Sequence, residues 1–561
     1  ISACLVGSEM CIRDSSSGGS YSANAPVTLS GAQSTFKVNG QGYTLLRSVQ
    51  DIRSLDQLGF GYYALAQDLD LKGSTFSTAL VSNLQGTLAG LGHTIDNLNI
   101  STTNGGNLGL IGTITNGSEV RDLAVTNATI VGTGYLGTLA GTNEGTIRNV
   151  AVSGSVTGET TLGGLVAANN SVITGSNART TVTSTSKGYF LGGLVGNNGA
   201  GATIDNAYST GNVSGGNTDT GGLVGANSGT IRNAYATGNV IAAADGLGLA
   251  IGGLVGSARD NSVISNVFAS GRVEGASRTG GIVGMFSGTG IVLENARWDA
   301  ATTGQANATG LDAGGTVTGT AAVGNAFSYT SYASLGTWSQ ISNSNVWVAK
   351  DAAGKAQWIM IEGQTRPFLA SEYSLAVSNS HQLQLMSYDL NASYNIVRDI
   401  DAKATGTSGS GMWGVGGFSP IGNGAQFMGS LDGQGHVISN LTVGNNTSFS
   451  GLFGFIGVTG TVRNVGLDNA VVGGFIQSGA LAAVNYGTID NVFANAKVSA
   501  QGFGNGVGGL VGQNSGTISN SYSSGTVTTN GPIIGQVGGL VGYNIGTINK
   551  SYSTSKINTI F

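Results

Sequence analysis

Charged residues are scarce in this sequence: Asp, Glu, Lys and Arg make up 9% of its 561 residues, against roughly 25% in ordinary soluble domains. The formal net charge is −5, with only 23 basic side chains. Because binding to phosphates needs clustered Lys and Arg, this composition argues against a nucleic-acid partner. No apolar run approaches the ~18 residues of a membrane-spanning helix, so we expect no membrane span.

Cysteine and histidine are also rare. The two cysteines, Cys4 and Cys11, lie near the start of the chain, so no disulfide framework supports the remainder. The three histidines are His93, His381 and His436, and none belongs to an HExxH zinc motif. With so few soft ligands there is no metal cluster to predict. We therefore expect no catalytic residue, no metal site and no cofactor.

Glycine, by contrast, is abundant, with 97 residues beside 40% apolar ones, and this apolar content is too high for a disordered chain. The apolar residues recur about every 29 positions, in a unit that reads GGLVGANSGTIRNAYATGNV over residues 221–240. The Leu of this unit serves as a marker. Its equivalents are Leu110, Leu139, Leu165, Leu194, Leu223, Leu254 and Ile282, and later Leu452, Leu481, Leu510 and Leu540.

Further columns keep register with the marker. An Asn follows four residues after it, an Ile eight after it, a second Asn ten after it and an aromatic residue twelve after it. In two units these positions shift by two residues, as expected for a loop that absorbs an insertion. The aromatic column comprises Tyr208, Tyr235, Phe268, Phe493, Tyr522 and Tyr552, and the first Asn column comprises Asn143, Asn169, Asn198, Asn227, Asn485, Asn514 and Asn544.

A unit of this length contains three short strand-like runs and cannot bury its own apolar face. Stacked ~4.8 Å apart, successive units form parallel sheets around one continuous core. Equivalent Asn side chains in neighbouring coils can then hydrogen-bond into a ladder. We predict an all-β fold, a parallel β-helix (β-solenoid) with about 29 residues per coil, wound right-handed as parallel crossovers generally are.

The repeat array occurs twice, each time after a similar lead-in: GTLAGLGHTIDNLNI over 86–100 is matched by GSLDGQGHVISNLTV over 429–443. The second copy has an additional stretch, MWGVGGFSPIG. The intervening segment is rich in tryptophan, whose bulky ring is suited to covering a solenoid end. We predict a non-native or disordered segment 1–22, a first β-helix array 23–289, an aromatic-rich connector or cap 290–372 holding Trp298, Trp338, Trp347 and Trp358, and a second array 373–561 that is truncated at its C-terminus.

Two carboxylate pairs in the lead-ins, Asp68/Asp70 and Asp399/Asp401, are candidate sites. Residues i and i+2 of a strand share a face, so each pair could bind Ca²⁺ or act as acid and base. A turn cap or a solvated face is the favoured interpretation, since the calcium-solenoid nonapeptide is missing. Asp432 is a conceivable third acid, but the first copy has Ala89 at that position, so the module does not require it.

Other motifs also favour structural interpretations. His93 and His436 occupy the same position of the duplicated G-x-G-H-x-I turn, which indicates a hydrogen-bonded turn residue. The Gly-rich stretch GVGGFSPIGNG contains no GxxxxGK[ST] phosphate-binding loop. The aromatic column could form a sugar-binding platform if it faces outward, but stacking between coils is the simpler explanation.

The GGLVGxNxGTI units resemble the GLUG motif, and the lead-in and connector are similar to those of filamentous haemagglutinin-type proteins. This resemblance covers nearly all of residues 40–561. It implies a secreted adhesin fragment from a Gram-negative cell surface, exported by two-partner secretion through an outer-membrane transporter. Such a shaft would not be an enzyme, and its partner would be a receptor or glycan on a host or neighbouring cell.

The alternative is the non-catalytic β-helical region of a larger secreted enzyme. IgA-specific metallopeptidases also carry GLUG-like repeats, and polysaccharide-degrading enzymes also contain β-helices. A polysaccharide lyase in its own right would need a groove with clustered acids and a basic residue. The 51 charged side chains of this chain (23 basic and 28 acidic) are instead thinly scattered.

Overall fold

A computed structural model describes residues 2–6, 9–13, 23, 26–31, 33–185, 188–215, 219–242, 250–312, 314–342, 344–406, 409, 411–444, 448–501, 506–530 and 536–560. Of residues 2–6, 9–13, 501, 530, 559 and 560 it describes the backbone alone. The chain forms two compact units, Ile1–Gly324 and Asn325–Phe561. Coils repeat about every 29 residues, so the predicted parallel β-solenoid is confirmed, while its right-handed winding stays a prediction.

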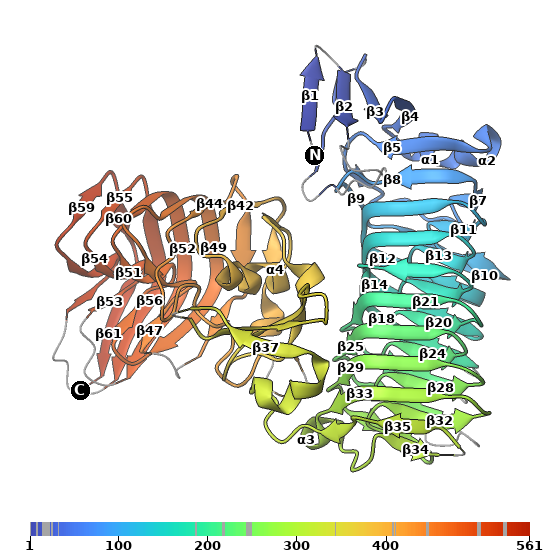
Figure 1. Cartoon of the computed structure of the whole chain (residues 1–561). Helices are drawn as coiled ribbons and strands as arrows, with labels where there is room; N and C mark the ends of the chain where they lie inside the picture. The colour runs from blue at the N-terminus through green and yellow to red at the C-terminus, as the bar shows by residue number, and fades with distance from the viewer. Residues whose placement is uncertain are drawn as a thin grey trace. The chain divides into compact units, whose positions relative to one another are not determined.

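The first unit is a stack of coils whose strands run one above another (Figure 1). One face is a nine-stranded parallel sheet. A second face continues through the long strands β12 (Glu119–Gly137) and β14 (Thr146–Gly158) into β17 (Val172–Thr174), β21 (Thr203–Ser209), β25 (Thr230–Ala236), β29 (Val263–Ala269) and β33 (Val292–Trp298). The strands of the nine-stranded sheet are β7 (Val81–Leu84), β11 (Ile111–Ile114), β13 (Ala140–Asn143), β16 (Val166–Asn169), β20 (Val195–Asn198), β24 (Val224–Asn227), β28 (Val255–Arg259), β32 (Val283–Ser287) and β34 (Thr309–Leu311).

The remaining strands of the coils are shorter than β12 and β14. They are β15 (Thr161–Gly163), β17 (Val172–Thr174), β18 (Asn177–Ser184), β19 (Phe190–Gly192), β21 (Thr203–Ser209), β22 (Val213–Ser214), β23 (Asp219–Gly221), β25 (Thr230–Ala236), β26 (Val240–Ile241), β27 (Ala250–Gly252), β29 (Val263–Ala269), β30 (Val273–Glu274), β31 (Thr279–Gly280) and β33 (Val292–Trp298). The earliest coils contain β4 (Gln41–Leu46), β5 (Gly61–Leu65), β6 (Leu69–Asp70), β8 (Gly86–Ala89), β9 (Thr94–Asp96) and β10 (Asn99–Leu108).

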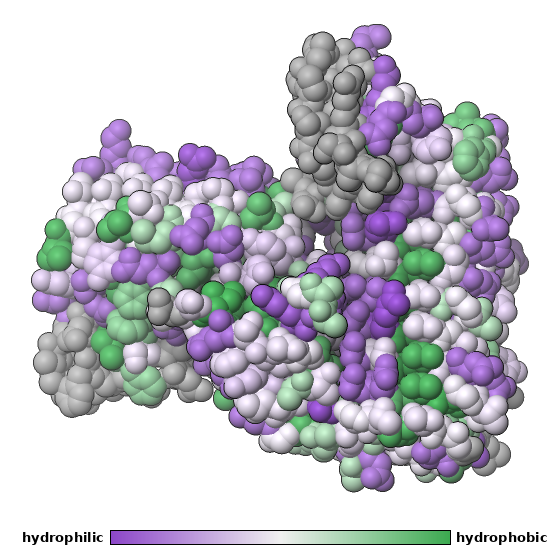
Figure 2. All heavy atoms as spheres, viewed as in Figure 1, coloured by the Kyte–Doolittle hydropathy of each residue, from purple (hydrophilic) through white to green (hydrophobic). Residues whose placement is uncertain are grey.

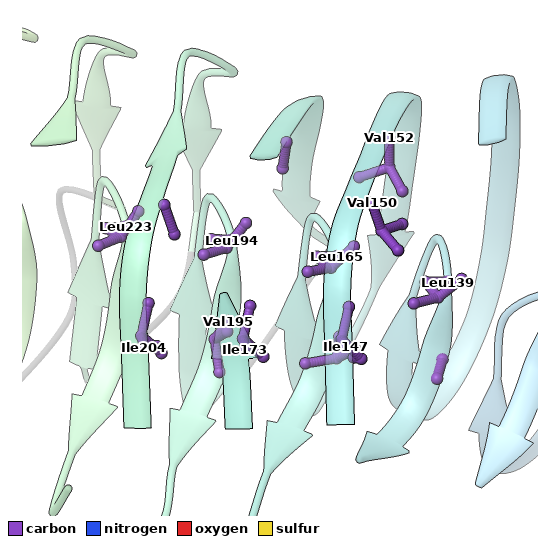
Figure 3. Close-up of a cluster of buried hydrophobic side chains, with 14 of the residues drawn as sticks. Leu139, Ile147, Val150, Val152, Leu165, Ile173, Leu194, Val195, Ile204 and Leu223 are labelled. Carbon is purple, nitrogen blue, oxygen red and sulfur yellow. The ribbon is translucent and has the colours of Figure 1, made fainter. Parts of the chain in front are cut away.

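The marker leucines occupy one column of the core. The backbone N–H of Leu194 donates to the carbonyl oxygen of Leu223 at 2.9 Å, and Leu223 donates to Leu254 at 2.8 Å. All three side chains are fully buried, and Figure 3 shows Leu139, Leu165, Leu194 and Leu223 at equivalent positions of successive coils. The 29-residue repeat therefore places identical side chains above and below one another, as predicted from the sequence.

The Gly-Gly pair that opens each unit has a steric cause. A Cβ atom on Gly222 would lie 2.2 Å from the carbonyl oxygen of Gly253 in the next coil, and one on Gly221 would lie 2.0 Å from the carbonyl oxygen of Val224. Both distances are far below van der Waals contact. At this corner a side chain on Gly221 would meet the backbone of its own coil and one on Gly222 that of the next coil, so only glycine fits.

The second unit repeats this architecture. Its three parallel sheets surround a core whose marker residues, Leu481 and Leu510, are joined by a backbone hydrogen bond of 2.9 Å. The largest sheet contains β41 (Ala376–Val377), β42 (Ser393–Ile396), β43 (Ile400–Asp401), β44 (Ser430–Asp432), β45 (Val437–Ser439), β46 (Thr442–Val443), β49 (Thr461–Gly474), β52 (Thr488–Gln501), β55 (Thr517–Ser519), β56 (Tyr522–Asn530), β59 (Thr547–Asn549), β60 (Tyr552–Ser553) and β61 (Lys556–Ile560).

The two smaller sheets have four strands each. One is built from β48 (Phe453–Ile456), β51 (Ala482–Asn485), β54 (Val511–Asn514) and β58 (Val541–Asn544), and the other from β47 (Phe449–Ser450), β50 (Gln477–Ser478), β53 (Gly506–Gly508) and β57 (Val537–Gly538).

Short helices precede both arrays. In the first unit α1 (Val49–Arg53) begins with a capping box between Ser48 and Asp51 and leads into α2 (Leu55–Leu58). Ile52 and Leu55 are buried in the first core. In the second unit α4 (Ser380–Leu385) is capped by the side chain of Asn379 and buries Leu383 in the second core. Each array therefore begins with a short helical segment that packs apolar side chains on its core.

The segment expected to form a connector divides between the two units. Residues up to 324 belong to the first unit, where Trp298 of β33 lies in the core. β35 (Thr316–Thr318) and β36 (Ala321–Ala322) pair with β33. The second unit contributes the 3₁₀ helix η1 (Tyr329–Leu335) and an antiparallel sheet of β37 (Thr337–Gln340), β38 (Val346–Lys350), β39 (Ala356–Ile361) and β40 (Phe368–Leu369), called the small sheet below.

The N-terminal prediction for residues 1–22 falls mostly outside the described residues. Within that segment, the backbones of β1 (Ser2–Val6) and β2 (Glu9–Arg13) pair antiparallel, with Cys4 opposite Cys11. Among the described residues, no helix is long and apolar enough to cross a membrane.

Candidate functional site

The carboxylate pairs of the two lead-ins hold neighbouring coils together. Oδ1 of Asp68 lies 3.1 Å from Nδ1 of His93 and accepts the backbone N–H of Thr94 at 2.7 Å. In the second unit Oδ1 of Asp399 makes the same two contacts, 3.1 Å from Nδ1 of His436 and 3.0 Å from the backbone nitrogen of Val437. The same Asp–His junction is thus built twice.

The second carboxylate of each pair makes a different link to the next coil. Oδ1 of Asp70 accepts the side-chain amide of Asn97 at 2.7 Å, and Oδ1 of Asp401 accepts that of Asn440 at 2.9 Å. Asn97 and Asn440 both have φ of 59°, a left-handed conformation that Asn tolerates better than most residues. The hydrogen bond from Asn97 holds the pKa of Asp70 below its ordinary value.

These contacts favour the turn-cap interpretation over a calcium site. Oδ1 of Asp70 and of Asp401 also accepts the backbone N–H two residues further on, at 2.9 and 3.0 Å, which caps the turn. No cluster of three or more His, Cys, Asp or Glu side chains suited to a metal occurs among the described residues. Asp432 is engaged elsewhere: its Oδ2 accepts from Nε of Arg463 at 3.0 Å. Burial alone would raise the pKa of Asp432, but hydrogen bonds from Asn464 and Gln434 and the charge of Arg463 lower it.

The third histidine belongs to a buried pair that the sequence does not reveal. Nδ1 of His381, in α4, lies 2.6 Å from Oε2 of Glu372, and both residues are more than nine-tenths buried. Oε1 of Glu372 accepts the backbone N–H of Leu369 at 2.9 Å. The rings of Phe368 and Trp413 enclose the imidazole at centroid distances of 5.1 and 5.5 Å. This enclosed pair fastens α4 to the end of the small sheet.

The first Asn column forms the predicted ladder in both units. Nδ2 of Asn143 donates to Oδ1 of Asn169 at 2.7 Å, and the chain of bonds continues to Asn198 at 2.8 Å and Asn227 at 2.7 Å. It ends there, because the next coil has Ala258 at this position. In the second unit Asn485, Asn514 and Asn544 are linked in the same way at 2.8 Å.

The aromatic column also stacks as predicted. The rings of Tyr208 and Tyr235 lie 4.8 Å apart with an interplanar angle of 1°, and those of Tyr235 and Phe268 lie 4.8 Å apart at 3°. Tyr235 stands between Ala234 and Ala236, which both line the core, so its ring points away from the core. Tyr208, Tyr235 and Phe268 are also almost fully buried, so this stack presents no open ring face of the kind that a sugar needs.

The visible outer faces of the arrays are mixed in hydropathy. Figure 2 shows pale residues interspersed with hydrophilic ones and with spots of hydrophobic ones. This surface agrees with the low charge of the sequence.

Comparison with known proteins identifies the repeat. The family model described as the GLUG motif matches residues 189–214, 216–241, 248–274 and 503–528. The chain carries GLUG motifs. These matches fall on the coils whose Leu, Asn and Gly columns are described above, and the resemblance to filamentous haemagglutinin-type proteins remains a separate proposal.

Two curated relatives share part of the chain. Halomucin of Haloquadratum walsbyi is 35% identical over 249 residues, which are 43% of this chain and 3% of that protein. A protein of Evansella cellulosilytica named as a Gly-rich membrane protein is 40% identical over 107 residues, which are 18% of this chain and 12% of that protein. The chain therefore corresponds to a small part of each relative.

A solved structure described as an immunoglobulin A1 protease from Bacteroides ovatus matches with a TM-score of 0.33 and 15% identity. The match covers 54% of this chain and 91% of that one.

Proposed function

We propose that this chain is a non-catalytic β-helical shaft of a secreted adhesin, displayed at a bacterial cell surface and mediating attachment. The observation that carries the proposal is the in-register stacking of coils through the Asn143–Asn169–Asn198–Asn227 ladder. A ladder of buried amides stiffens the part of the solenoid that it spans, because each coil there is bonded to the next by side chains as well as by backbone. A stiff, charge-poor rod is suited to holding a binding surface away from a cell.

The surface location draws support from the relatives. One of them is named as a membrane protein, and a protein of this kind can contain long repeat regions outside the membrane. Export by two-partner secretion from a Gram-negative cell rests on the resemblance of the lead-ins and connector to filamentous haemagglutinin-type proteins. The receptor would be a protein or glycan on a host or neighbouring cell.

A display experiment tests the proposal. The chain is anchored on a non-adherent bacterial strain, and attachment to epithelial monolayers and to other bacteria is counted against the same strain displaying an unrelated solenoid of equal length. We expect attachment to rise several-fold. Equal attachment by both strains would contradict the proposed adhesin function.

A parallel assay addresses the alternative of an enzyme region. The purified chain is incubated with immunoglobulin A, pectin and alginate, and new chain ends are measured. Release of products at a rate above that of a heat-denatured sample would overturn the non-catalytic assignment.

A further inference from the structure

The second unit contains a polar groove beside the small sheet, with a volume of about 680 Å³. Its lining includes Trp347, Glu362 and Asn423, together with the side chains of Gln340 and Asn345. It differs in character from the outer faces of the arrays, because an indole ring, a carboxylate and several amides converge on one space. All of these residues belong to the same unit.

Stacking fixes the orientation of the indole ring of Trp347. Tyr329, at the start of η1, stacks on one face of it with a centroid distance of 3.6 Å and an interplanar angle of 12°. Trp347 lines the groove and is partly exposed, so the face opposite Tyr329 is the one that a ligand could reach. This differs from the aromatic column of the arrays, where each inner ring has both faces covered.

The carboxylate of Glu362 holds Tyr329 against the ring of Trp347, and its oxygens can also accept hydrogen bonds from a ligand in the groove. Its Oε1 accepts the hydroxyl of Ser328 at 2.7 Å, and its Oε2 accepts the backbone N–H of Tyr329 at 2.8 Å. These two bonds lock Tyr329 beneath Trp347. Since a carboxylate has about four lone-pair positions, each oxygen retains capacity for a hydroxyl donor.

The amides complete the lining. In the described part of the chain, the side chains of Asn345 and Asn423 have no recorded hydrogen-bond partner, whereas Nε2 of Gln340 donates to the carbonyl oxygen of Ser344 at 2.6 Å. An Asn amide presents both donors and an acceptor. Two such groups beside a flat ring suit a ligand that has hydroxyls around an apolar face.

The groove forms where the chain departs from its repeat. Asn423 directly follows the stretch MWGVGGFSPIG (412–422), which only the second copy contains. A bridge between Trp413 and Thr365 ties that stretch to the small sheet, and a bridge between Ile421 and Phe453 ties it to the solenoid. Binding residues commonly sit on such insertions, which a rigid scaffold positions.

From this arrangement we infer that the groove binds a neutral saccharide, one pyranose ring stacking on Trp347 while its hydroxyls bond to Glu362, Asn345 and Asn423. Glu362 is the one charged side chain in the lining, so uronic acids and sialic acids are disfavoured by like charge. The inference names a ligand class for the adhesin and to that extent rests on the proposed function.

Saturation-transfer NMR and calorimetry with lactose, maltose and cellobiose test the inference on the full chain. We expect a Kd on the order of 1 mM for at least one of them, a value typical of a shallow site with few contacts. Trp347→Ala should weaken binding at least tenfold, and Asn423→Ala about threefold or more. Trp347→Phe, which keeps a flat ring against Tyr329, should retain part of the binding and covers the case in which Trp347→Ala does not fold.

Ser339→Ala is the matched control. Ser339 pairs with Val348 on the opposite face of the small sheet, so its loss should leave binding unchanged. The inference is overturned if none of the three sugars binds at concentrations up to about 20 mM, if Asn423→Ala and Trp347→Phe bind like the parent, or if glucuronic acid binds more tightly than the neutral sugars. If the sugars bind but the display experiment shows no attachment, this inference stands and the adhesin proposal is contradicted. If attachment rises but no sugar binds, the adhesin proposal stands and this inference is contradicted.

Discussion

Nδ2 of Asn198 donates to Oδ1 of Asn227 in the next coil at 2.7 Å, and both side chains are fully buried. Replacing Asn198 by Ala removes the acceptor of Asn169 and the donor of Asn227. Each of these also bonds to its own turn, through Ser171 and Gly229, so the loss is partial. We expect Asn198→Ala to reduce local stability by about 1–3 kcal/mol.

Hydrogen exchange is the appropriate measurement for this variant, because repeat arrays open locally rather than in one step. Protection should fall for amides of β16, β20 and β24 and remain unchanged in the second unit. Asn104→Ala, at an exposed Asn of the same array, is the control. Equal loss of protection in both variants would show that the ladder adds nothing.

The Gly-Gly corner gives a second prediction. A Cβ on Gly222 would lie 2.2 Å from a backbone carbonyl oxygen of the next coil, and neither backbone can withdraw without breaking the sheet. We expect Gly222→Ala to cost about 3 kcal/mol or more. Gly42→Ala in β4, where no atom lies within 4 Å of the new Cβ, should be neutral or stabilise by about 0.5 kcal/mol. Thermal unfolding of the two variants would separate them, and similar melting temperatures would refute the steric explanation.

The repeat columns account for how much of the fold was predictable. A buried Leu, an Asn and a Gly-Gly pair recur at constant spacing because each stacks on its own copy, so Leu194, Leu223 and Leu254 could be placed from sequence alone. The same logic predicted the Asn ladder and the aromatic stack. It left open whether the rings point inward, since the sequence gives spacing but not the direction of a strand's faces.

Features outside the repeat were not predictable in this way. The helices α1 and α4 have five and six residues, too few to show a 3.6-residue apolar period. Their one detectable signal was the Ser48-x-x-Asp51 capping pattern. The Glu372–His381 pair and the groove at Trp347 arise from contacts between non-repeating segments. No residue spacing in the sequence predicts such contacts. Turn caps were the favoured interpretation of the carboxylate pairs, but their His partners, 25 and 37 residues further on, were visible only as a duplicated turn.

The aromatic column gives a third prediction. Tyr522 stacks on Phe493 at 5.5 Å and on Tyr552 at 5.2 Å. Tyr522→Leu removes both ring contacts and should destabilise the second unit by about 1–3 kcal/mol, at roughly 0.5–1.5 kcal/mol for each pair. Tyr522→Phe keeps the stack and should stay within about 0.5 kcal/mol of the parent. Chemical unfolding followed by near-ultraviolet circular dichroism measures both, and a Phe variant as unstable as the Leu variant would assign the effect to the hydroxyl instead.

Acidification provides a fourth prediction, centred on Asp490. Hydrogen bonds from the hydroxyl of Ser519 at 2.6 Å and the amide of Asn520 at 2.8 Å hold the pKa of Asp490 below its ordinary value. A carboxylate with a lowered pKa in the folded state stabilises that state above the unfolded pKa of about 3.9, and this contribution is lost as the pH falls toward the folded value. The melting temperature of the second unit should therefore drop on going from about pH 6 to about pH 2.5, and Asp490→Asn should make that drop smaller.

The size of this effect is limited by solvent, because Asp490 is only partly buried. Screening should keep the contribution to a few tenths of a kcal/mol, or about 1 °C in melting temperature, and added salt should reduce it further. Asp389→Asn is the control, since the exposed carboxylate of Asp389 accepts only the N–H of Asn391 within its own turn. If Asp389→Asn reduces the acid-induced drop in melting temperature as much as Asp490→Asn does, loss of any surface carboxylate has this effect. The inter-coil bonds from Ser519 and Asn520 would then not be the cause of the pH dependence.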